Sequence, residues 1–402
     1  MKAPLILWLN QRLPWIARWQ HFLRHYRVPS NLNAYYCFGI LAIVALCMQW
    51  ISGLWLTMFY TPTTLGAFDS IENMMRNVPW GWLLRYCHST GASAIFIVLY
   101  VHIFRGLLYG SYQKPRELVW IFGCFLFLIL MLEAFMGYVL PWGQMSYWSA
   151  QVLTSLLGVV PLVGHTLLVW VRGGDLVNDA LLHRFFALHV IAIPVLVFVL
   201  SYLHVVSLHH VGSNNPEGFE TRPDGGGQHV EFVLFYPRFV WKDLLAVLIF
   251  LSCFFAIVFF CPDLHGFFLE SSNFSKAQPL MTPSTIRVLW YLSPFYAMLR
   301  AIPHPLGGLF VFICALGVWL FLPWLDRSAV RSMRYKGPVS RIALGFFVFN
   351  FIVLCALGLM NLSPLTYTMA QCSTVYYFAY FLLMPLYTRY ERVTSCPESC
   401  NA

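Results

Sequence analysis

The feature that most constrains this chain is a series of eight long apolar runs that carry few charges. A helix needs about 20 mostly apolar residues to cross the hydrocarbon core of a membrane. The sequence therefore predicts an all-α polytopic membrane protein with eight transmembrane helices. The expected spans are 35–60, 87–104, 118–140, 185–208, 244–261, 306–325, 342–360 and 370–386. Only 10% of the residues are charged, against about 25% in soluble domains. This excludes a soluble enzyme, a disordered protein and a nucleic-acid binder, although the net charge is +9.

Two further apolar segments, 146–171 and 279–302, are interrupted. The first contains Gly158 and Pro161, and the second contains arginines and several prolines. Irregular backbone is not tolerated against lipid. We therefore expect surface helices in these two loops rather than further membrane spans.

The basic residues predict the orientation. Eighteen of the 25 Lys and Arg residues fall in the N-terminal segment, the loops on its side and the C-terminal tail, and seven fall on the opposite side. Cytoplasmic loops carry an excess of basic residues. Both termini are therefore expected in the cytoplasm, and both interrupted segments on the outer face.

Four histidines inside the expected spans recur at intervals that place them in two pairs. His88 and His102 are 14 residues apart, so they project from nearly one helix face, about 21 Å apart along the axis. His189 and His204 are 15 residues apart, and a kink or bulge at Pro194, between them, can restore the register. The two spans run in the same direction, so His88 lies at the depth of His189, and His102 at that of His204. Lone membrane histidines are often hydrogen-bonded core residues, but matched pairs favour two bis-histidine haem sites. A zinc site is disfavoured, because the sequence places no Cys or carboxylate near either histidine pair as a further ligand.

Four glycines repeat the same interval of 14 residues in two other spans. They are Gly39 and Gly53 in the first span, and Gly123 and Gly137 in the third. A missing side chain lets a flat macrocycle approach the backbone, although small residues also serve plain helix packing. Arg85 and Arg105 border the span of His88 and His102, where they either pair with haem propionates or extend to the membrane interface.

The chain also contains a set of specific local motifs. They are Gly81-Trp82-Leu83, Arg85-Tyr86-x-His88, Gly91-Ala92-Ser93, Gly137-Tyr138-Val139-Leu140-Pro141-Trp142-Gly143-Gln144-Met145-Ser146, Arg184-Phe185-Phe186-x-Leu188-His189, Gly212-Ser213-Asn214-Asn215-Pro216 and Pro294-Phe295-Tyr296-Ala297. On these motifs, nearly the whole chain resembles the cytochrome b subunit of the quinol–cytochrome c reductase (cytochrome bc) complex, in a proteobacterial form. The resemblance implies two b-type haems, a Rieske-type iron–sulfur protein and a cytochrome c-type subunit as partners, and a homodimer.

The resemblance also implies two quinone sites. The outer quinol site matches Tyr138, Gly143, Met145, Tyr291 and Tyr296. The inner quinone site matches three polar residues at the cytoplasmic ends of two spans, His209, Lys242 and Asp243. A histidine and a carboxylate placed there can deliver two protons to a reduced quinone.

One departure from the family concerns the outer site. Its Pro-Glu-Trp-Tyr motif reads Val288-Leu289-Trp290-Tyr291 here, and leucine cannot accept a proton. Glu133 is a candidate replacement, because an intramembrane carboxylate is a functional candidate by default. Cys37 stands where plastid-type relatives attach an additional haem, but His209 and Asp243 favour a quinone at that place.

The expected organisation follows from these assignments. It comprises an N-terminal cytoplasmic amphipathic segment (1–34), four haem-binding helices with surface helices (35–211), a cytoplasmic loop (212–243), four helices with the quinol-site loop (244–390) and a tail (391–402). The chain is then expected in a bacterial inner membrane, carrying electrons from quinol oxidised at the outer face to quinone reduced at the inner face. Two alternatives stay open: a diverged di-haem cytochrome b with one working quinone site that serves another dehydrogenase, and a transporter without cofactors.

Overall fold

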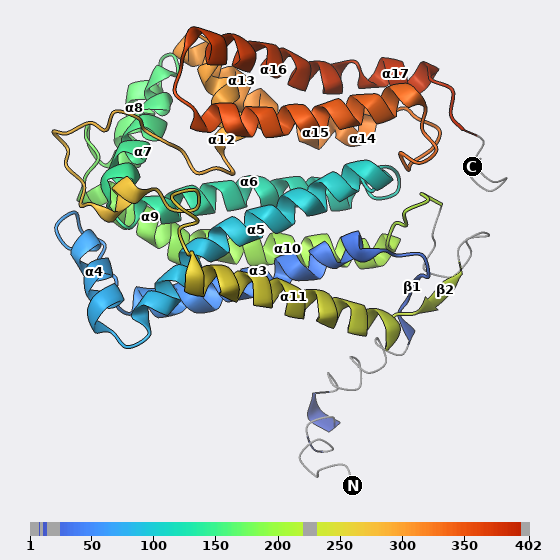
Figure 1. The fold of residues 1–402 in the computed structure, drawn as a ribbon, viewed down its shortest axis with the longest axis horizontal. Coiled ribbons are helices and arrows are strands. Elements are labelled where there is room, and N and C mark those ends of the chain that lie inside the picture. The colour runs from blue at the N-terminus through green and yellow to red at the C-terminus, as the bar shows by residue number, and fades with distance from the viewer. Residues whose placement is uncertain (1–7, 9–10, 14–24, 220–230, 395–402) are drawn as a thin grey trace.

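The structure is a computed structural model that describes residues 8, 11–13, 25–219 and 231–394. Most of the described chain is helical, and its long helices run side by side along one direction (Figure 1). Apolar runs form such helices because, in lipid, every backbone polar group must be satisfied within its own segment. The predicted segments 1–34, 212–243 and 391–402 fall partly outside the described residues.

One layer of the molecule contains the first five long helical segments (Figure 1). They are α3 (Phe38–Thr57), which continues the 3₁₀ turn η1 (Ala34–Cys37), α5 (Gly81–Tyr109), α6 (Glu117–Val139), α9 (Asp179–Ala187) with η3 (Leu188–Ala192) and α10 (Ile193–Val211), and α11 (Arg238–Phe260). His88 and His102 lie in α5, His189 in η3 and His204 in α10, and the four predicted glycines lie in α3 and α6.

The second layer contains the C-terminal helices (Figure 1). They are α12 (Ser293–Arg300), α13 (Pro305–Gly317) with η5 (Val318–Phe321) and α14 (Leu322–Leu325), α15 (Pro338–Leu359), α16 (Pro364–Leu382) and α17 (Met384–Tyr390). In α5 and α15, 39% of the most apolar stretch is buried, against 11% in α11. α5 and α15 therefore face the core, whereas α11 presents most of its apolar surface outward.

Short elements cover the two ends of the helix layers (Figure 1). At one end lie α4 (Ala67–Asn77), α7 (Gln144–Ser155), η2 (Leu156–Val159), α8 (Gly164–Arg172) and η4 (Ser271–Phe274). At the other end, β1 (Arg27–Pro29) pairs antiparallel with β2 (Phe232–Leu234). The sequence did not lead us to expect α4. Helices α7 and α8 occupy most of the first interrupted segment and α12 part of the second, and their position at a membrane surface stays a prediction.

Seven helical stretches in the described part of the chain are long and apolar enough to cross a membrane. The eighth expected range, 370–386, is not among them. The helix there is α16, which begins at Pro364 and ends at Leu382, before α17 begins at Met384. Polar residues such as Gln371 and Ser373 lower its hydropathy, so an eighth span stays a prediction.

A π-helical turn interrupts the helix that carries His189 and His204. This turn, η3, ends one residue before Ile193, whose amide donates to the Leu188 carbonyl five residues back. Pro194 follows directly and has no amide hydrogen to donate. A π turn takes up one residue more than an α turn, so it offsets the extra residue in the interval of 15. The bulge predicted near Pro194 is confirmed.

Candidate functional site

The four histidines meet as two pairs in the layer of α3, α5, α6 and α10. The ring centroids of His88 and His189 lie 6.1 Å apart, and those of His102 and His204 lie 6.4 Å apart. Two metal–imidazole bonds of about 2 Å each, plus two ring radii of about 1 Å, also add to about 6 Å. Each pair therefore fits one metal ion between its rings.

The hydrogen bonds of the imidazoles fix which nitrogen is free. His204 Nδ1 lies 2.8 Å from the Val119 carbonyl and His189 Nδ1 lies 2.9 Å from the Glu133 carbonyl. Because a carbonyl only accepts, both Nδ1 atoms carry the proton, and both Nε2 atoms keep a lone pair. Such a bond to Nδ1 is typical of a histidine that binds a metal through Nε2.

The other two histidines differ in their Nδ1 partners. His88 Nδ1 lies 3.0 Å from Ser52 Oγ. The Ser52 hydroxyl already donates to the Met48 carbonyl at 2.7 Å, so it accepts from His88, whose Nε2 is then free as well. His102 Nδ1 is buried and has no hydrogen-bond partner among the described residues.

Each predicted glycine lies against one of these imidazoles. A Cβ added to Gly39 would stand 3.7 Å from His102 Cε1, and one added to Gly53 would stand 3.0 Å from His88 Cε1. A Cβ on Gly123 would stand 3.2 Å from His204 Cε1, and one on Gly137 would overlap His189. In the structure the glycines therefore make room for the imidazoles themselves, where the sequence had suggested room for a macrocycle.

Each histidine pair opens into a cavity of ligand size. The cavity at His88 and His189, called here the His88 cavity, has a volume of about 400 Å³ and is lined by Arg85. The cavity at His102 and His204, the His102 cavity, has a volume of about 510 Å³ and is lined by Arg105. Both arginines lie inside α5, because this helix begins before and ends after the predicted span.

Arg105 has the features of an anion-binding group. Its guanidinium lies 4.6 Å from the centre of the Tyr36 ring and donates to Ser111 Oγ at 3.3 Å. Its Nε is buried without a hydrogen-bond partner among the described residues. A buried donor left unpaired is costly, so a carboxylate of a bound group, such as a haem propionate, suits this position.

The donor set fits haem better than a free metal ion. No cluster of three or more His, Cys, Asp or Glu side chains suited to a metal ion occurs in the described ranges. Two imidazoles with free Nε2 lone pairs are the protein ligands of a bis-histidine haem, whose other four ligands come from the macrocycle.

Sequence reasoning missed three polar residues, of which two line the His102 cavity and one bonds to a histidine of the other pair. Ser52 bonds to His88, and its only signal was its place beside Gly53. Arg116 is 2% exposed, lines the His102 cavity and donates to the Gly212 carbonyl at 3.0 Å. Asn214 lines the same cavity and donates to the Tyr109 carbonyl at 2.8 Å. Its motif, Gly212-Ser213-Asn214-Asn215-Pro216, was the signal available in the sequence.

The predicted residues of the outer quinol site are only partly brought together. Tyr138 and Tyr291 line the His88 cavity. Gly143, Met145 and Tyr296 do not line it. Gly143 packs against Asn273, Met145 is buried in α7, and the Tyr296 ring carries the Arg300 guanidinium at 4.7 Å.

Because Leu289 cannot accept a proton, two nearby carboxylates are candidate proton acceptors in its place. Leu289 is 5% exposed and lines the His88 cavity. Glu133 also lines this cavity, and its Oε1 lies 3.0 Å from His189 Nδ1. Glu270, which the sequence did not single out, accepts a hydrogen bond of 2.6 Å from the Tyr138 hydroxyl. Burial raises the pKa of the Glu270 carboxyl above its usual range.

The predicted residues of the inner quinone site lie around a third cavity, the Asp243 cavity. It has a volume of about 860 Å³ and is lined by Lys242, Asp243 and Cys37. The Lys242 ammonium lies 4.9 Å from the centre of the Phe239 ring. His209 lines the neighbouring His102 cavity, of which Asp243 is also a wall. The structure thus brings His209, Lys242 and Asp243 to one end of α10 and α11.

Comparisons with known proteins agree with this geometry. Residues 23–212 match the family model "Cytochrome b/b6/petB", and residues 276–378 match "Cytochrome b(C-terminal)/b6/petD". Cytochrome b of Allochromatium vinosum is 48% identical over 99% of this chain and 98% of the relative. Cytochrome b of Rickettsia prowazekii is 43% identical over 98% of this chain and 96% of the relative.

A solved structure titled "Hyperthermophilic respiratory Complex III" superposes with a TM-score of 0.90 at 35% identity, covering 96% of this chain and 99% of that chain. The family models and the relatives span both helix layers, and paired imidazoles are one ligand set that binds haem iron. Haem binding is a property of this family, which leaves no support for a transporter without cofactors. The chain therefore belongs to the cytochrome b family, in the form found in respiratory bc complexes.

Proposed function

We propose that this chain is the di-haem subunit that carries electrons across the membrane in a quinol–cytochrome c reductase. His88 and His189 would hold the outer haem, and His102 and His204 the inner haem. The observation that carries the proposal is the pair of centroid distances, 6.1 and 6.4 Å, together with Nδ1 bonds that leave Nε2 free on three of the rings. When bound, each haem iron accepts and passes on one electron at a time.

The spacing of the two sites suits transfer across the bilayer. The 14-residue interval between His88 and His102 in the continuous helix α5 corresponds to about 21 Å of helix rise. The hydrocarbon core of a membrane is about 30 Å thick. Arg85 and Arg105 would hold the propionates at the two ends of this path.

Quinol would be oxidised in the His88 cavity, beside Tyr138 and Tyr291. Quinone would be reduced at the Asp243 cavity. There, the Asp243 carboxyl and the His209 imidazole supply two protons, and the Lys242 ammonium stabilises negative charge on the reduced ring. This arrangement takes up protons on one side and releases them on the other. In this proposal the Asp243 cavity faces the cytoplasm of a bacterial cell, as do both termini.

The chain would work within a larger assembly. In the described ranges no set of three or more metal-binding side chains occurs that could hold an iron–sulfur cluster, and no Cys-x-x-Cys-His motif occurs in the sequence. A Rieske-type iron–sulfur protein and a cytochrome c-type subunit would therefore supply those centres. A homodimer is proposed from the family alone.

Membranes that contain the other subunits of the complex, prepared with and without this chain, test the proposal. Quinol-dependent reduction of cytochrome c is expected only when the chain is present. A reduced-minus-oxidised spectrum with b-type bands but no such reduction would instead favour a cytochrome b with one working quinone site. A spectrum without b-type bands would contradict both.

A further inference from the structure

The departure at Leu289 leaves Glu133 as the one Asp or Glu, among the described residues, that lines the His88 cavity. Its Oε1 lies 3.0 Å from His189 Nδ1, and its Oε2 is buried without a hydrogen-bond partner among the described residues. Glu133 lies beside His189 in the interior of α6, so a proton released at the outer surface needs another lining group that leads out of the cavity. Tyr138 is such a group, because its hydroxyl leads out of the cavity to a second carboxyl.

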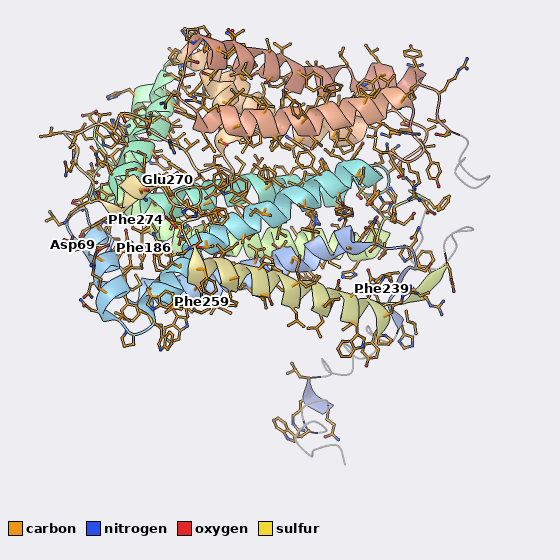
Figure 2. All side chains as sticks on the ribbon, in the orientation of Figure 1. Asp69, Phe186, Phe239, Phe259, Glu270 and Phe274 are labelled. Atoms are coloured by element: carbon orange, nitrogen blue, oxygen red, sulfur yellow. The ribbon has the colours of Figure 1, made fainter. Side chains whose placement is uncertain are left out.

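That second carboxyl belongs to Glu270, at the start of η4. Its Oε2 accepts the Tyr138 hydroxyl hydrogen bond at 2.6 Å. Tyr138 lines the cavity, whereas Glu270 does not. Glu270 is 8% exposed and is followed by the exposed Ser271. Figure 2 shows Glu270 at the end of the molecule where α4 and α7 lie, opposite to Phe239.

The loop that carries Glu270 is held against the end of α6 by several contacts. Asn273 Oδ1 accepts from the Ser146 amide at 2.9 Å, and Ser146 Oγ donates to the Tyr138 carbonyl at 2.6 Å. A Cβ at Gly143 would overlap the backbone carbonyl of Asn273, so only glycine allows this approach. Gly143 and Ser146 both belong to the motif 137–146. They hold the loop of Glu270 against the end of α6, so that Glu270 stays next to Tyr138.

We propose that Glu270 takes the proton from quinol in the His88 cavity through the Tyr138 hydroxyl, replacing the carboxylate that Leu289 lacks. This inference rests on the proposed function. One quinol O–H bond breaks as Tyr138 Oη receives that proton. The O–H bond of Tyr138 breaks as its own proton passes to Glu270 Oε2, where a new O–H bond forms. The electron leaves quinol for the iron–sulfur partner, and Tyr138 ends as it began.

The charged surroundings of Glu270 suit a reversible acceptor. The titratable groups that act on it are Tyr138 from α6, and Tyr291 and Arg287 from the segment before α12. From α7, Ser146 bonds to Asn273 of the same loop and does not titrate. Burial raises the pKa of Glu270, while the Tyr138 hydrogen bond and the Arg287 charge oppose the rise. Only the ionised carboxylate accepts a proton, so turnover rises with pH through this raised pKa.

The test compares four single variants and one double variant in the assembled complex, each with its haem content measured first. Glu270→Gln is expected to keep both b-type haems and to slow quinol-dependent cytochrome c reduction by on the order of 10²-fold. It also removes the acidic limb of the pH profile. Tyr138→Phe gives the same loss, and adding Glu270→Gln to it causes little further loss, because the two act in series. Glu270→Asp keeps most of the rate and the acidic limb. Glu72→Gln, on α4 at the same end, leaves both unchanged.

A rescue variant separates a chemical role from a structural one. Leu289→Glu added to Glu270→Gln is expected to recover part of the rate, because it returns a carboxylate to the cavity wall. A wild-type rate and pH profile in Glu270→Gln or in Tyr138→Phe would overturn the proposal. If Glu270→Gln does not assemble with haem, Tyr138→Phe alone decides, because it removes only a hydroxyl. A wild-type complex without quinol-dependent turnover would instead contradict the proposed function itself.

Discussion

The four glycines that face the imidazoles differ in the space they leave, and this difference predicts a graded loss of haem. A Cβ on Gly39 would make an ordinary contact of 3.7 Å with His102, and a Cβ on Gly137 would overlap the ring of His189. The His189 ring cannot retreat easily, because its Nδ1 is bound to the Glu133 carbonyl at 2.9 Å. Gly→Ala at these positions therefore tests the close approach directly.

The magnitude follows from the cost of overpacking. Forcing extra atoms into a packed site costs about 1–3 kcal/mol, and each 1.4 kcal/mol is a tenfold change in affinity. Gly137→Ala is therefore expected to weaken the haem between His88 and His189 by about 5- to 150-fold. Gly53→Ala and Gly123→Ala, whose Cβ atoms would stand 3.0 and 3.2 Å from the histidine rings, should lose haem to a degree between Gly137→Ala and Gly39→Ala. Gly39→Ala is expected to keep haem near the wild-type level.

The assay is the haem-to-protein ratio of each purified variant, with the two haems resolved by redox titration. Gly345→Ala is the matched control, because a Cβ there meets nothing within 4 Å and alanine is intrinsically the better helix former by about 1 kcal/mol. Equal haem loss in Gly39→Ala and Gly137→Ala, or two full haems in Gly137→Ala, would refute the reasoning.

Four further predictions follow from the structure. His102→Leu should remove the inner haem while outer-haem absorbance persists, and equal loss of both bands would contradict separate sites. Asp243→Asn should slow reoxidation of the inner haem more than its reduction in stopped-flow traces, and the reverse order would contradict its role at the quinone. Lys336 and Asp326 form a buried ion pair, so Asp326→Asn should cost about 3–5 kcal/mol. Adding Lys336→Met should recover part of that loss in thermal unfolding, whereas additive losses would contradict the pairing. Because the folded-state pKa of Glu270 is raised, its contribution to stability is full below the unfolded pKa and is lost as pH rises through the folded pKa. Glu270→Gln should flatten that part of the Tm–pH curve, and an unchanged slope would contradict it.

The pairing of the four histidines could be predicted from the sequence because their signal is periodic. A helix converts the interval between His88 and His102 directly into a shared face and a depth, and the structure pairs both histidines as expected. Even the irregular interval between His189 and His204 could be interpreted, since Pro194 marks where a helix loses a hydrogen bond. The glycines were found by the same interval, although their contact with the imidazoles required coordinates.

The loops carry no such periodicity, and there the sequence was a poorer guide. Glu270 lies 132 residues from Tyr138 in the chain, so nothing local indicates that they meet. Ser52 and Arg116 act through hydrogen bonds to distant segments that a pattern of apolar residues does not reveal. The range 370–386 was placed by hydropathy, whereas its helix begins at Pro364, where Ser363 caps it by accepting from the Thr366 amide.

The measurement that tests the central claim most directly is the haem content of the purified chain, read with its reduced-minus-oxidised spectrum and a redox titration. Two b-type haems per chain are expected, with distinct midpoint potentials and the low-spin spectrum of two imidazole ligands. No b-type bands, or a single haem that survives loss of either histidine pair, would contradict the account.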